Sequence, residues 1–364
     1  RQVMKKEIGV LTFHKAVSYG AAYQTYALQT YLNGIGYDVK IVDYIPPRFT
    51  TFNSIFSMPA NGNKVKKIIK FIPYVLSKAT SVYMLQRFNK KYLTLTDSYC
   101  TEQELIDSDL RFDTFITGSD QVWNLEFDKF ENIRPYLLSF TKQKKISYAA
   151  SIGMTSFEGC PEKILHQFIN LLNQYDSISV REVSAKILLD SIGIESEWVL
   201  DPTFLLKRSD WEKISQKPKE SSYVLVYGLY RNKTLYKIAK SIAKNNGLEI
   251  VNVSDNYDFC SSAKNKVIIT HEQLLGYLMN AECVVTDSFH GLALSVNFNT
   301  PFYVVPAKRY NTRIDSLLKM FELSNRCITE ENSFPSDYVM NFERVNSKLK
   351  IEREKAYYYL QHEV

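Results

Sequence analysis

Short apolar runs alternate with helix-patterned segments along most of the chain. The first run, 8–13, is followed by a loop, by a segment with helical spacing over 21–35, and by a second strand-like run over 38–44. Gly34 and Gly36 mark the end of the helix. A strand, a helix and a strand in this order predict parallel strands, because a helical crossover returns the chain to the same end of the sheet.

The same alternation fills the rest of the chain in two series. The first continues to about residue 193, and the second begins near residue 223, after a linker broken by Pro202. Further strands are expected at 114–117, 146–150, 177–181, 223–227, 249–253, 267–270, 283–286 and 302–305, and further helices at 101–109, 162–175, 233–245, 272–280 and 290–296. The pattern predicts an α/β protein with two Rossmann-like domains that face each other across a cleft. We expect these domains at 1–193 and 194–337, and a C-terminal amphipathic helix at 338–364 that packs back on the first domain.

The composition is that of a globular protein. Of the 364 residues, 45% are hydrophobic and 23% are charged, which excludes a disordered or collagen-like chain. The five cysteines are scattered and no His, Cys or carboxylate set has the spacing of a metal site, so we expect reduced thiols and no metal. No apolar run is long enough to span a bilayer and no signal pattern precedes the first strand. We therefore expect a cytoplasmic protein whose natural start is at or near Met4.

Positive charge is concentrated in one segment. The formal net charge is +6, yet no Asp or Glu occurs between Asp43 and Asp97, so the remainder of the chain has a net charge of −3. The nine basic residues of this window are Arg48, Lys64, Lys66, Lys67, Lys70, Lys78, Arg87, Lys90 and Lys91. We interpret 48–92 as a basic insertion in the first domain.

The cations between 64 and 91 are interleaved with Ile, Phe, Tyr and Leu. This mixture suits a helix that contacts an anionic membrane surface at the inner face of the membrane. A helical pair with a solvated basic face is the alternative. A nucleic-acid partner is not expected, because no binding motif for nucleic acid is present.

The segment 284–291 joins a buried strand to a helix of small residues through a polar turn. His290 falls at the carboxyl end of the strand and at the start of the helix, where backbone amides favour an anion and an imidazole can act as general acid or base. The alternative is a capped helix start, with Asp287 or Ser288 as the N-cap and His290 merely packed.

Two other basic positions follow predicted strands. Arg181 can bind a phosphate or a carboxylate in a bidentate manner, or it can pair with Glu182 or another nearby carboxylate. The loop after the last strand carries Lys308, Arg309 and Arg313. These residues either add positive charge to the cleft near His290 or form a solvated helix start.

The segment 117–124 ends a strand with a glycine and a dense polar cluster that includes Trp123. Such a mixture is typical of sugar-binding sites, while a tight turn with a buried Trp is the alternative. The loops 18–22 and 149–153 are rich in small residues that allow close backbone approach. The chain contains no G-x-G-x-x-G and no G-x-x-x-x-G-K-[ST], which argues against nicotinamide cofactors and P-loop chemistry.

Taken in order, five short motifs resemble the polysaccharide pyruvyl transferase family. They are 19–22 (YGAA), 118–124 (GSDQVWN), 179–182 (SVRE), 201–203 (DPT) and 287–291 (DSFHG). The resemblance runs from about residue 8 to about residue 323. It implies a two-domain fold like that of GT-B glycosyltransferases. It also implies transfer of pyruvate from phosphoenolpyruvate, as co-substrate and without a cofactor, to two hydroxyls of a sugar in a surface polysaccharide or its lipid-linked precursor. Galactose-type and mannose-type sugars are the usual acceptors.

The resemblance also implies roles for individual residues. An Arg-Leu-His triplet of the family is associated with the donor site and falls on 288–290, so the histidine is kept but the arginine is replaced by a serine. Another cation must then supply the missing charge. We expect His290 to protonate C3 of phosphoenolpyruvate and Asp120 to act as base for the acceptor hydroxyl. The expected donor-binding residues are Arg181, Ser288, Phe289, Gly291, Lys308, Arg309 and Arg313, and the expected acceptor-binding residues are Tyr19, Gly20, Ser119, Trp123, Asn124 and Ser151.

Two other functions stay open at this point. A glycosyltransferase that uses a nucleotide sugar can be built on the same frame, with Glu272 or Asp287 holding the ribose. A non-catalytic family member that binds glycans is also compatible with the serine at position 288.

Overall fold

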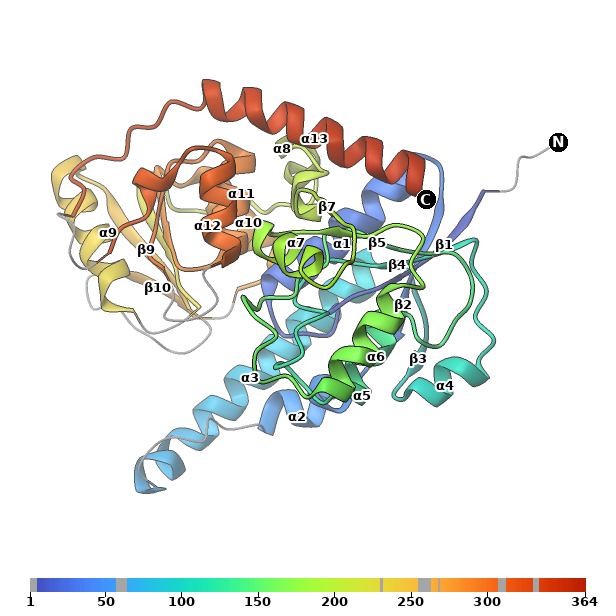
Figure 1. Ribbon diagram of the computed structural model, residues 1–364. Helices are drawn as coiled ribbons and strands as arrows, with labels where there is room; N and C mark the ends of the chain where they lie inside the picture. The colour runs from blue at the N-terminus through green and yellow to red at the C-terminus, as the bar shows by residue number, and fades with distance from the viewer. Residues whose placement is uncertain are drawn as a thin grey trace. The chain divides into compact units, whose positions relative to one another are not determined.

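The computed structural model describes residues 5–56, 64–229, 232–254, 263–267, 269–306, 312–329 and 334–364 (Figure 1). Side chains are described for all of these except 64–73 and 267. The chain forms two compact units. Unit 1 holds the residues up to Thr50, Phe88–Leu205 and Lys350–Val364, and unit 2 holds Thr51–Arg87 and Leu206–Leu349.

Unit 1 contains a five-stranded parallel sheet in the order β3-β2-β1-β4-β5. A short parallel pair, β6 with β7, lies next to β5, because Ala150 bridges to Val180. The strands are β1 (Glu7–Leu11), β2 (Asp38–Tyr44), β3 (Leu95–Tyr99), β4 (Thr114–Thr117), β5 (Lys145–Ser147), β6 (Ser179–Val180) and β7 (Glu197–Trp198). The helices are α1 (Tyr19–Gly34), α4 (Glu102–Asp107), α5 (Phe130–Ile133), α6 (Glu162–Leu172) and α7 (Val183–Asp190), with 3₁₀ turns at Pro47–Phe49, Arg134–Leu137 and Pro202–Phe204.

Alternate residues of the central strands face two different cores. In β1, Ile8 and Val10 belong to one core and Leu11 to the other, and in β4 Ile116 and Phe115 divide in the same way. Successive side chains of a strand point to opposite faces, so both faces of this sheet are covered. The carboxyl ends of the strands are therefore the exposed ends at which loops can carry chemistry.

The apolar pattern does not predict β3. Its residues alternate Leu, Thr, Asp, Ser and Tyr, and each is only half-buried or exposed, because β3 is an edge strand. Its pairing with β2 also shifts in register between Ile41 and Asp43. A strand that buries neither face fully lacks the hydrophobic run by which strands are recognised.

Unit 1 extends to Leu205, whereas the sequence pattern ends the first domain at 193. Val199 and Leu205 are buried in one of its cores, and the hydroxyl of Tyr148 donates a hydrogen bond to the carbonyl of Leu200 (3.0 Å). These contacts assign the linker to unit 1. Residues 51–87 of the basic insertion belong to unit 2, whereas the sequence pattern places the insertion in the first domain.

Unit 2 contains a second five-stranded parallel sheet in the order β10-β9-β8-β11-β12. Its strands are β8 (Tyr223–Tyr227), β9 (Glu249–Ser254), β10 (Lys264–Val267), β11 (Cys283–Thr286) and β12 (Phe302–Val304). Its helices are α2 (Thr51–Phe56), α8 (Arg208–Glu212), α9 (Lys233–Asn246), α10 (His271–Asn280), α11 (Phe289–Phe298) and α12 (Thr312–Met320), with a 3₁₀ turn at Ser324–Arg326. The long helix α3 (Lys64–Tyr92) also begins in this unit. The two sheets confirm the predicted α/β class with two Rossmann-like parts.

The C-terminal helix α13 (Glu343–Glu363) packs on unit 1, as predicted. Arg353 donates to the carbonyl of Phe204 (2.7 Å) and Tyr357 donates to that of Leu205 (2.8 Å). The ring of Tyr357 also stacks on Tyr31 of α1, with centroids 4.8 Å apart. The last four turns of α13 are thus part of the core of unit 1.

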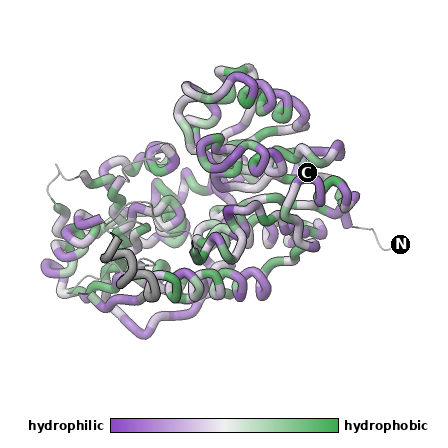
Figure 2. The backbone as a smooth tube through the Cα atoms, turned by 90° about the horizontal axis from the view of Figure 1, so that it is seen from below, coloured by the Kyte–Doolittle hydropathy of each residue, from purple (hydrophilic) through white to green (hydrophobic). Residues whose placement is uncertain are grey.

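Hydrophilic and hydrophobic residues are interleaved along the helices (Figure 2). In α9, for example, Leu235, Ile238 and Ile242 are buried, and Lys237 and Lys240 are exposed. Within the described residues, no helix is long and apolar enough to cross a membrane.

Candidate functional site

The site in unit 1 forms at the carboxyl ends of β1 and β4. The strand that follows β1 in the chain, β2, lies on one side of the β1–β4 pair, and the strand that follows β4, β5, lies on the other side. The two connections therefore leave in opposite directions, and ligands of open α/β sheets bind at such a point. The N–H of Gly118 donates to the carbonyl of Leu11 (2.9 Å), and the Thr12 hydroxyl donates to the carbonyl of Ser119 (2.6 Å). A Cβ at Gly118 would lie 2.9 Å from Cβ of Thr12. The close approach of these two loops therefore requires glycine at position 118.

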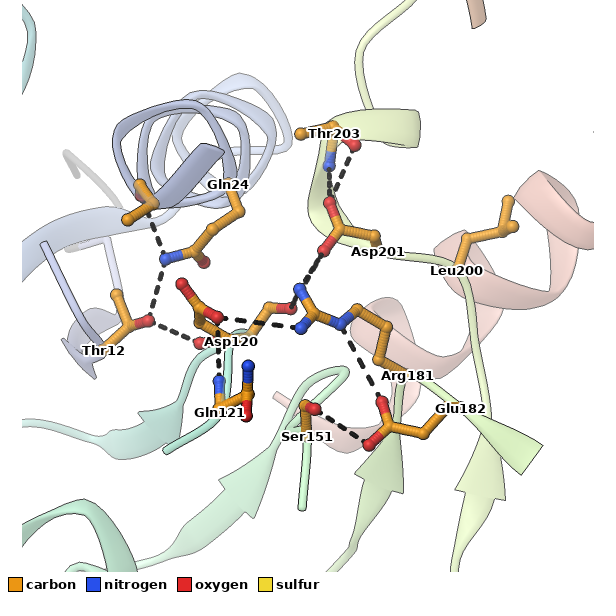
Figure 3. Close-up of polar contacts among 12 residues, drawn as sticks. Thr12, Gln24, Asp120, Gln121, Ser151, Arg181, Glu182, Leu200, Asp201 and Thr203 are labelled. Carbon is orange, nitrogen blue, oxygen red and sulfur yellow. Dashed lines mark hydrogen bonds and ion pairs between the residues drawn. The ribbon is translucent and has the colours of Figure 1, made fainter. Parts of the chain in front are cut away.

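Arg181, directly after β6, is the centre of a buried charge network (Figure 3). Its Nη1 donates to Oδ2 of Asp201 at 2.9 Å and to Oγ of Ser119 at 3.2 Å. Its Nη2 lies 3.7 Å from Oδ1 of Asp120, and its Nε lies 3.9 Å from Oε2 of Glu182. Only 1% of the Arg181 side chain is exposed. The network therefore links the loops after β4, β6 and β7 around a guanidinium that is shielded from water.

Burial acts to lower the pKa of Arg181, but the carboxylates of Asp201, Asp120 and Glu182 outweigh it and raise that pKa above its usual value. The guanidinium is charged, and its charge is compensated inside unit 1. This is the pairing with nearby carboxylates that the sequence left open as the alternative to donor binding. To bind a donor anion, the guanidinium would have to leave these partners.

Glu182 fixes the loop that follows β5. One of its oxygens, Oε1, accepts hydrogen bonds from the Ser151 hydroxyl (2.8 Å) and from the N–H groups of Ile152 and Gly153 (both 3.1 Å). Gly153 has φ of +65°, and a Cβ there would lie 2.5 Å from Oε1 of Gln121. Ser151 is fully buried. The hydroxyl that was expected to bind the acceptor is thus used to hold this loop.

Asp201 joins the network to the turn at Pro202–Phe204. Its Oδ1 accepts from the N–H (2.9 Å) and the hydroxyl (2.7 Å) of Thr203, while its Oδ2 accepts from Arg181 and from the Ser119 hydroxyl (3.0 Å). Ser119, another expected acceptor ligand, is fully buried. The side chains of Asp201 and Ser119 therefore hold the loops of the site together.

Asp120 occupies the turn after β4 in a backbone conformation that residues other than glycine seldom adopt, with φ of +79°. Its Oδ1 accepts from the N–H of Gln121 (2.9 Å) and faces Arg181, whereas its Oδ2 makes no hydrogen bond with any described residue. The side chain is 16% exposed. Strained residues of this kind cluster at functional sites. Oδ1 of Asp120 is therefore fixed by Gln121 and Arg181, whereas Oδ2 has no hydrogen bond within the described part of the chain.

Gln24 of α1 is a site residue that the sequence analysis missed. Its Nε2 donates to the Thr12 hydroxyl (2.9 Å), the carbonyl of Ala21 (3.1 Å) and the Thr25 hydroxyl (2.9 Å). Its side chain is fully buried, and its Oε1 accepts no hydrogen bond from the described residues. The sequence signal that could have revealed it is a glutamine on the buried face of the first turns of α1, where the other residues are apolar or small.

Four predicted positions of unit 1 lie in its interior. Trp123 is fully buried, and its indole N–H donates to the carbonyl of Tyr136 (3.0 Å), so the structure has the tight turn with a buried Trp that was the alternative. Asn124 donates to Oε1 of Gln121 (2.9 Å). Tyr19 and Gly20 open α1 and are buried as well. None of these side chains presents a ring face or an amide to solvent.

A second polar cluster lies beside the site, at the ends of β1 and β2. Nε2 of His14 lies 2.6 Å from Oδ1 of Asp43, and its Nδ1 lies 3.1 Å from the carbonyl of Thr12. Ser98 donates to the other oxygen of Asp43 (2.5 Å). Burial acts to raise the pKa of Asp43, but hydrogen bonds from His14 and Ser98 and the charge of Lys15 lower it to about 2. Both ring nitrogens of His14 thus face oxygen atoms of unit 1.

In unit 2, the DSFHG motif lies at the corresponding position of the second sheet, between the carboxyl ends of β8 and β11. The Thr286 hydroxyl donates to the carbonyl of Tyr227 (2.6 Å), and Oδ1 of Asp287 accepts from the N–H of Leu229 (2.7 Å). A Cβ at Gly291 would lie 2.5 Å from Oγ1 of Thr286. Gly291 therefore allows α11 to begin directly against these two strands, and its role is one of packing.

Ser288 is the N-cap of α11, since its hydroxyl accepts from the N–H of Gly291 (3.2 Å). This is the capped helix start that the sequence left open. His290 stands in the first turn of α11, is 9% exposed, and lies edge to face with Phe289 (5.1 Å between centroids). The first-turn amides and an imidazole together form a site suited to an anion and to proton transfer.

Arg313 brings positive charge to this motif. Its guanidinium lies 6.0 Å from the ring centre of Phe289, and it belongs to the first turn of α12. Lys308 and Arg309, the other expected donor ligands of this loop, lie outside the described residues. Among the residues that are described, no group of three or more His, Cys, Asp or Glu side chains could hold a metal ion.

The sequence profile of the polysaccharide pyruvyl transferase family matches residues 19–308. The chain belongs to that family. The match covers all five motifs and confirms the resemblance. No curated protein matches the chain.

Among solved structures, the chain is similar to an epimerase, to MnaA and to a glycosyltransferase. A UDP-GlcNAc 2-epimerase of Methanocaldococcus jannaschii in complex with UDP-GlcNAc and UDP is 13% identical, with 97% of this chain and 100% of that one covered and a TM-score of 0.46. MnaA of S. aureus with UDP is 14% identical, with 97% and 90% covered and a TM-score of 0.46. The glycosyltransferase SnogD of Streptomyces nogalater is 9% identical, with 97% and 96% covered and a TM-score of 0.45. The two five-stranded parallel sheets themselves define the fold.

Three of the five family motifs meet in unit 1 around Arg181. The GSDQVWN motif supplies Ser119 and Asp120, SVRE supplies Arg181 and Glu182, and DPT supplies Asp201. Residues that are about 60 and 20 positions from Arg181 in the chain are thus brought together by one buried charge. In this member of the family, the motifs build one supported site that leaves an oxygen of Asp120 open.

Proposed function

We propose that the protein transfers the pyruvyl group of phosphoenolpyruvate to two hydroxyls of one sugar, in a surface polysaccharide or its lipid-linked precursor, to form a ketal. Family membership supports the reaction class. Asp120 and His290 are assigned as the reacting groups because each lies at the switch point of its own sheet.

The reaction needs two proton transfers. C3 of phosphoenolpyruvate gains a proton as the oxygen of the first hydroxyl bonds to C2, and the second hydroxyl then bonds to C2 as the bond from C2 to the phosphate oxygen breaks. One hydroxyl proton is thereby balanced by the proton added to C3, and the other leaves with the phosphate. We assign the base for the acceptor hydroxyl to Oδ2 of Asp120, because Oδ1 is already held by Gln121 and Arg181. We assign the acid at C3 to the imidazole of His290.

The donor carries a carboxylate and a phosphate, which call for fixed positive charge. The first-turn amides of α11 provide part of it. Arg313 takes the place of the arginine that the family triplet has at position 288, because it is the described cation next to Phe289. Ser288 is occupied as the helix cap.

Thermal unfolding with phosphoenolpyruvate tests this proposal. A ligand at about 100 times its dissociation constant stabilises the folded protein by about 2.7 kcal/mol, which a melting curve resolves. We expect a shift with phosphoenolpyruvate, a smaller shift for Arg313→Gln, and an unchanged shift for the matched variant Arg326→Gln, which changes an arginine of the same unit that lies over Tyr303. A shift with UDP-sugars and none with phosphoenolpyruvate would contradict the proposal in favour of a glycosyltransferase.

The roles of the two catalytic groups are tested by phosphate release in the presence of a sugar acceptor. Asp120→Asn keeps the shape of the side chain and its bond to Gln121, so we expect normal phosphoenolpyruvate binding and a loss of turnover of at least about 100-fold. His290→Asn should lose turnover to a similar degree. The control is His166→Asn, on the exposed face of α6, with full activity. Full activity of Asp120→Asn would remove that residue from the mechanism.

A further inference from the structure

The helices α2 and α3 present exposed aromatic and aliphatic side chains beside a run of cations. Phe52 is 69% exposed and Phe56 is 43% exposed, and their rings lie 4.9 Å apart on α2. Leu76 and Tyr83, seven residues apart on α3, are 59% and 61% exposed. We call these four side chains the apolar face. Residues seven apart lie on one side of a helix, so Leu76 and Tyr83 point the same way.

The two helices are joined close to this face. Nε2 of Gln86 donates to the hydroxyl of Thr51 (3.3 Å), the first residue of α2, and Figure 1 shows α2 beside α3. The opposite side of α3 is packed, because Ser77, Val82 and Leu85 are buried. The exposed side therefore remains available after α3 has satisfied its own contacts.

The segment that carries this face has charges of one sign. From 44 to 96 the chain has nine cations and no carboxylate, and Lys64, Lys66, Lys67 and Lys70 all fall in the first two turns of α3. Within the described part of α3, Arg87 lies 3.7 Å from Glu272. A surface with this charge repels a second copy of itself, which argues against self-association through it.

We infer that this surface docks the protein on an anionic lipid bilayer. Aromatic and leucine side chains enter the boundary between headgroups and acyl chains, and lysines beside them are attracted to anionic headgroups. A protein partner would have to match the run of lysines over 64–78 with acidic residues in a fixed arrangement, whereas an anionic bilayer supplies negative charge at any orientation. This docking does not depend on the reaction that the protein catalyses.

Cosedimentation of the full chain with vesicles tests the inference. We expect binding to vesicles that contain about one third phosphatidylglycerol, none to pure phosphatidylcholine, and release when salt is raised from about 0.1 M to 1 M, because the screening length falls from about 10 Å to 3 Å. The variant Lys66→Gln/Lys70→Gln should bind more weakly by about fivefold per lysine removed. The matched control is Lys240→Gln/Lys244→Gln, which removes the same charges at the same spacing from α9 and should bind like the wild type.

The apolar face is tested by Leu76→Ser/Tyr83→Ser and by Phe52→Ser/Phe56→Ser. Each should lower vesicle binding at least about tenfold with an unchanged melting temperature, because the side chains are exposed. Ile187→Ser, a 63% exposed side chain on α7, is the control and should change nothing. Equal binding to neutral vesicles, absence of binding to any vesicle, or a dimer in solution that these serine variants dissolve would each overturn the inference.

Discussion

The buried network around Arg181 makes a sharp prediction about stability. Arg181→Met removes the guanidinium that donates to Oδ2 of Asp201, whose side chain is fully buried, and leaves that carboxylate without this ion-pair partner. Breaking a buried ion pair by removal of one partner costs about 3–5 kcal/mol. For a folding unit of this size, about 2–4 °C of melting temperature is lost per kcal/mol, so we expect a decrease of about 10 °C.

The charge itself is tested by a double-mutant cycle. Asp201→Asn alone should also destabilise the protein, because Arg181 loses its closest carboxylate. In Arg181→Met/Asp201→Asn no unpaired charge is left between these two positions, so the double variant should be more stable than the sum of the two single effects by more than about 1 kcal/mol.

A matched arginine in the same unit serves as control. Arg134 pairs with both oxygens of Glu102 (3.0 Å each), but its side chain is 36% exposed. Arg134→Met should cost about 1 kcal/mol or less, as partly exposed pairs do. If Arg181→Met melted within about 2 °C of the wild type and lost its stabilisation by phosphoenolpyruvate, Arg181 would be a donor ligand and the reasoning from burial would be refuted.

Three further predictions concern residues around the site and in unit 2. The pKa of Asp43 is lowered from its ordinary 3.8 to about 2, so the stability that its carboxylate contributes is complete above pH 3.8 and is lost as the pH falls through 2. Asp43→Asn should remove about 1–2 kcal/mol of this acid dependence of the unfolding free energy, allowing for solvent screening. Urea titrations at pH 2–5 measure it. Gly276→Ala places a Cβ 1.8 Å from the carbonyl oxygen of Gln216 and should destabilise unit 2 by about 1–3 kcal/mol in the same assay, whereas Gly34→Ala, with open space around it, should not. Trp123→Phe should lower stability without changing the affinity for any sugar, because its indole faces Tyr136 and not solvent.

The sequence predicted the strands whose two faces are both buried. The inner strands Thr114–Thr117 and Cys283–Thr286 are found at their predicted bounds, because each is fully buried and bounded by turns. The edge strand Leu95–Tyr99 was missed, and Lys264–Val267 lies just before its predicted range, because edge strands bury less and carry polar residues. The division into units depends on contacts far apart in the chain, which local patterns do not contain.

The sequence also located the candidate site, but it could not assign partners within it. The GSDQVWN, SVRE and DSFHG motifs fall at strand ends, as predicted, because the glycines and polar residues there interrupt the apolar runs. Which carboxylate Arg181 meets depends on how the loops after three strands fold together. Asp201 is 20 positions away and Ser119 is 62 positions away, so no local pattern pairs them.

A motif therefore identifies residues that the site requires. Whether such a residue supports the site or faces the substrate depends on whether its polar atoms already bond to other residues. Ser119 and Arg181 direct their polar groups at Asp201, and Ser151 directs its hydroxyl at Glu182, so their hydrogen bonds hold loops together. Asp120 stands in the same cluster, yet one of its oxygens has no described partner and its φ is +79°. A strained backbone is kept only where the surroundings enforce it. The supporting network is thus the physical reason that Asp120 can hold a carboxylate oxygen open at the end of β4.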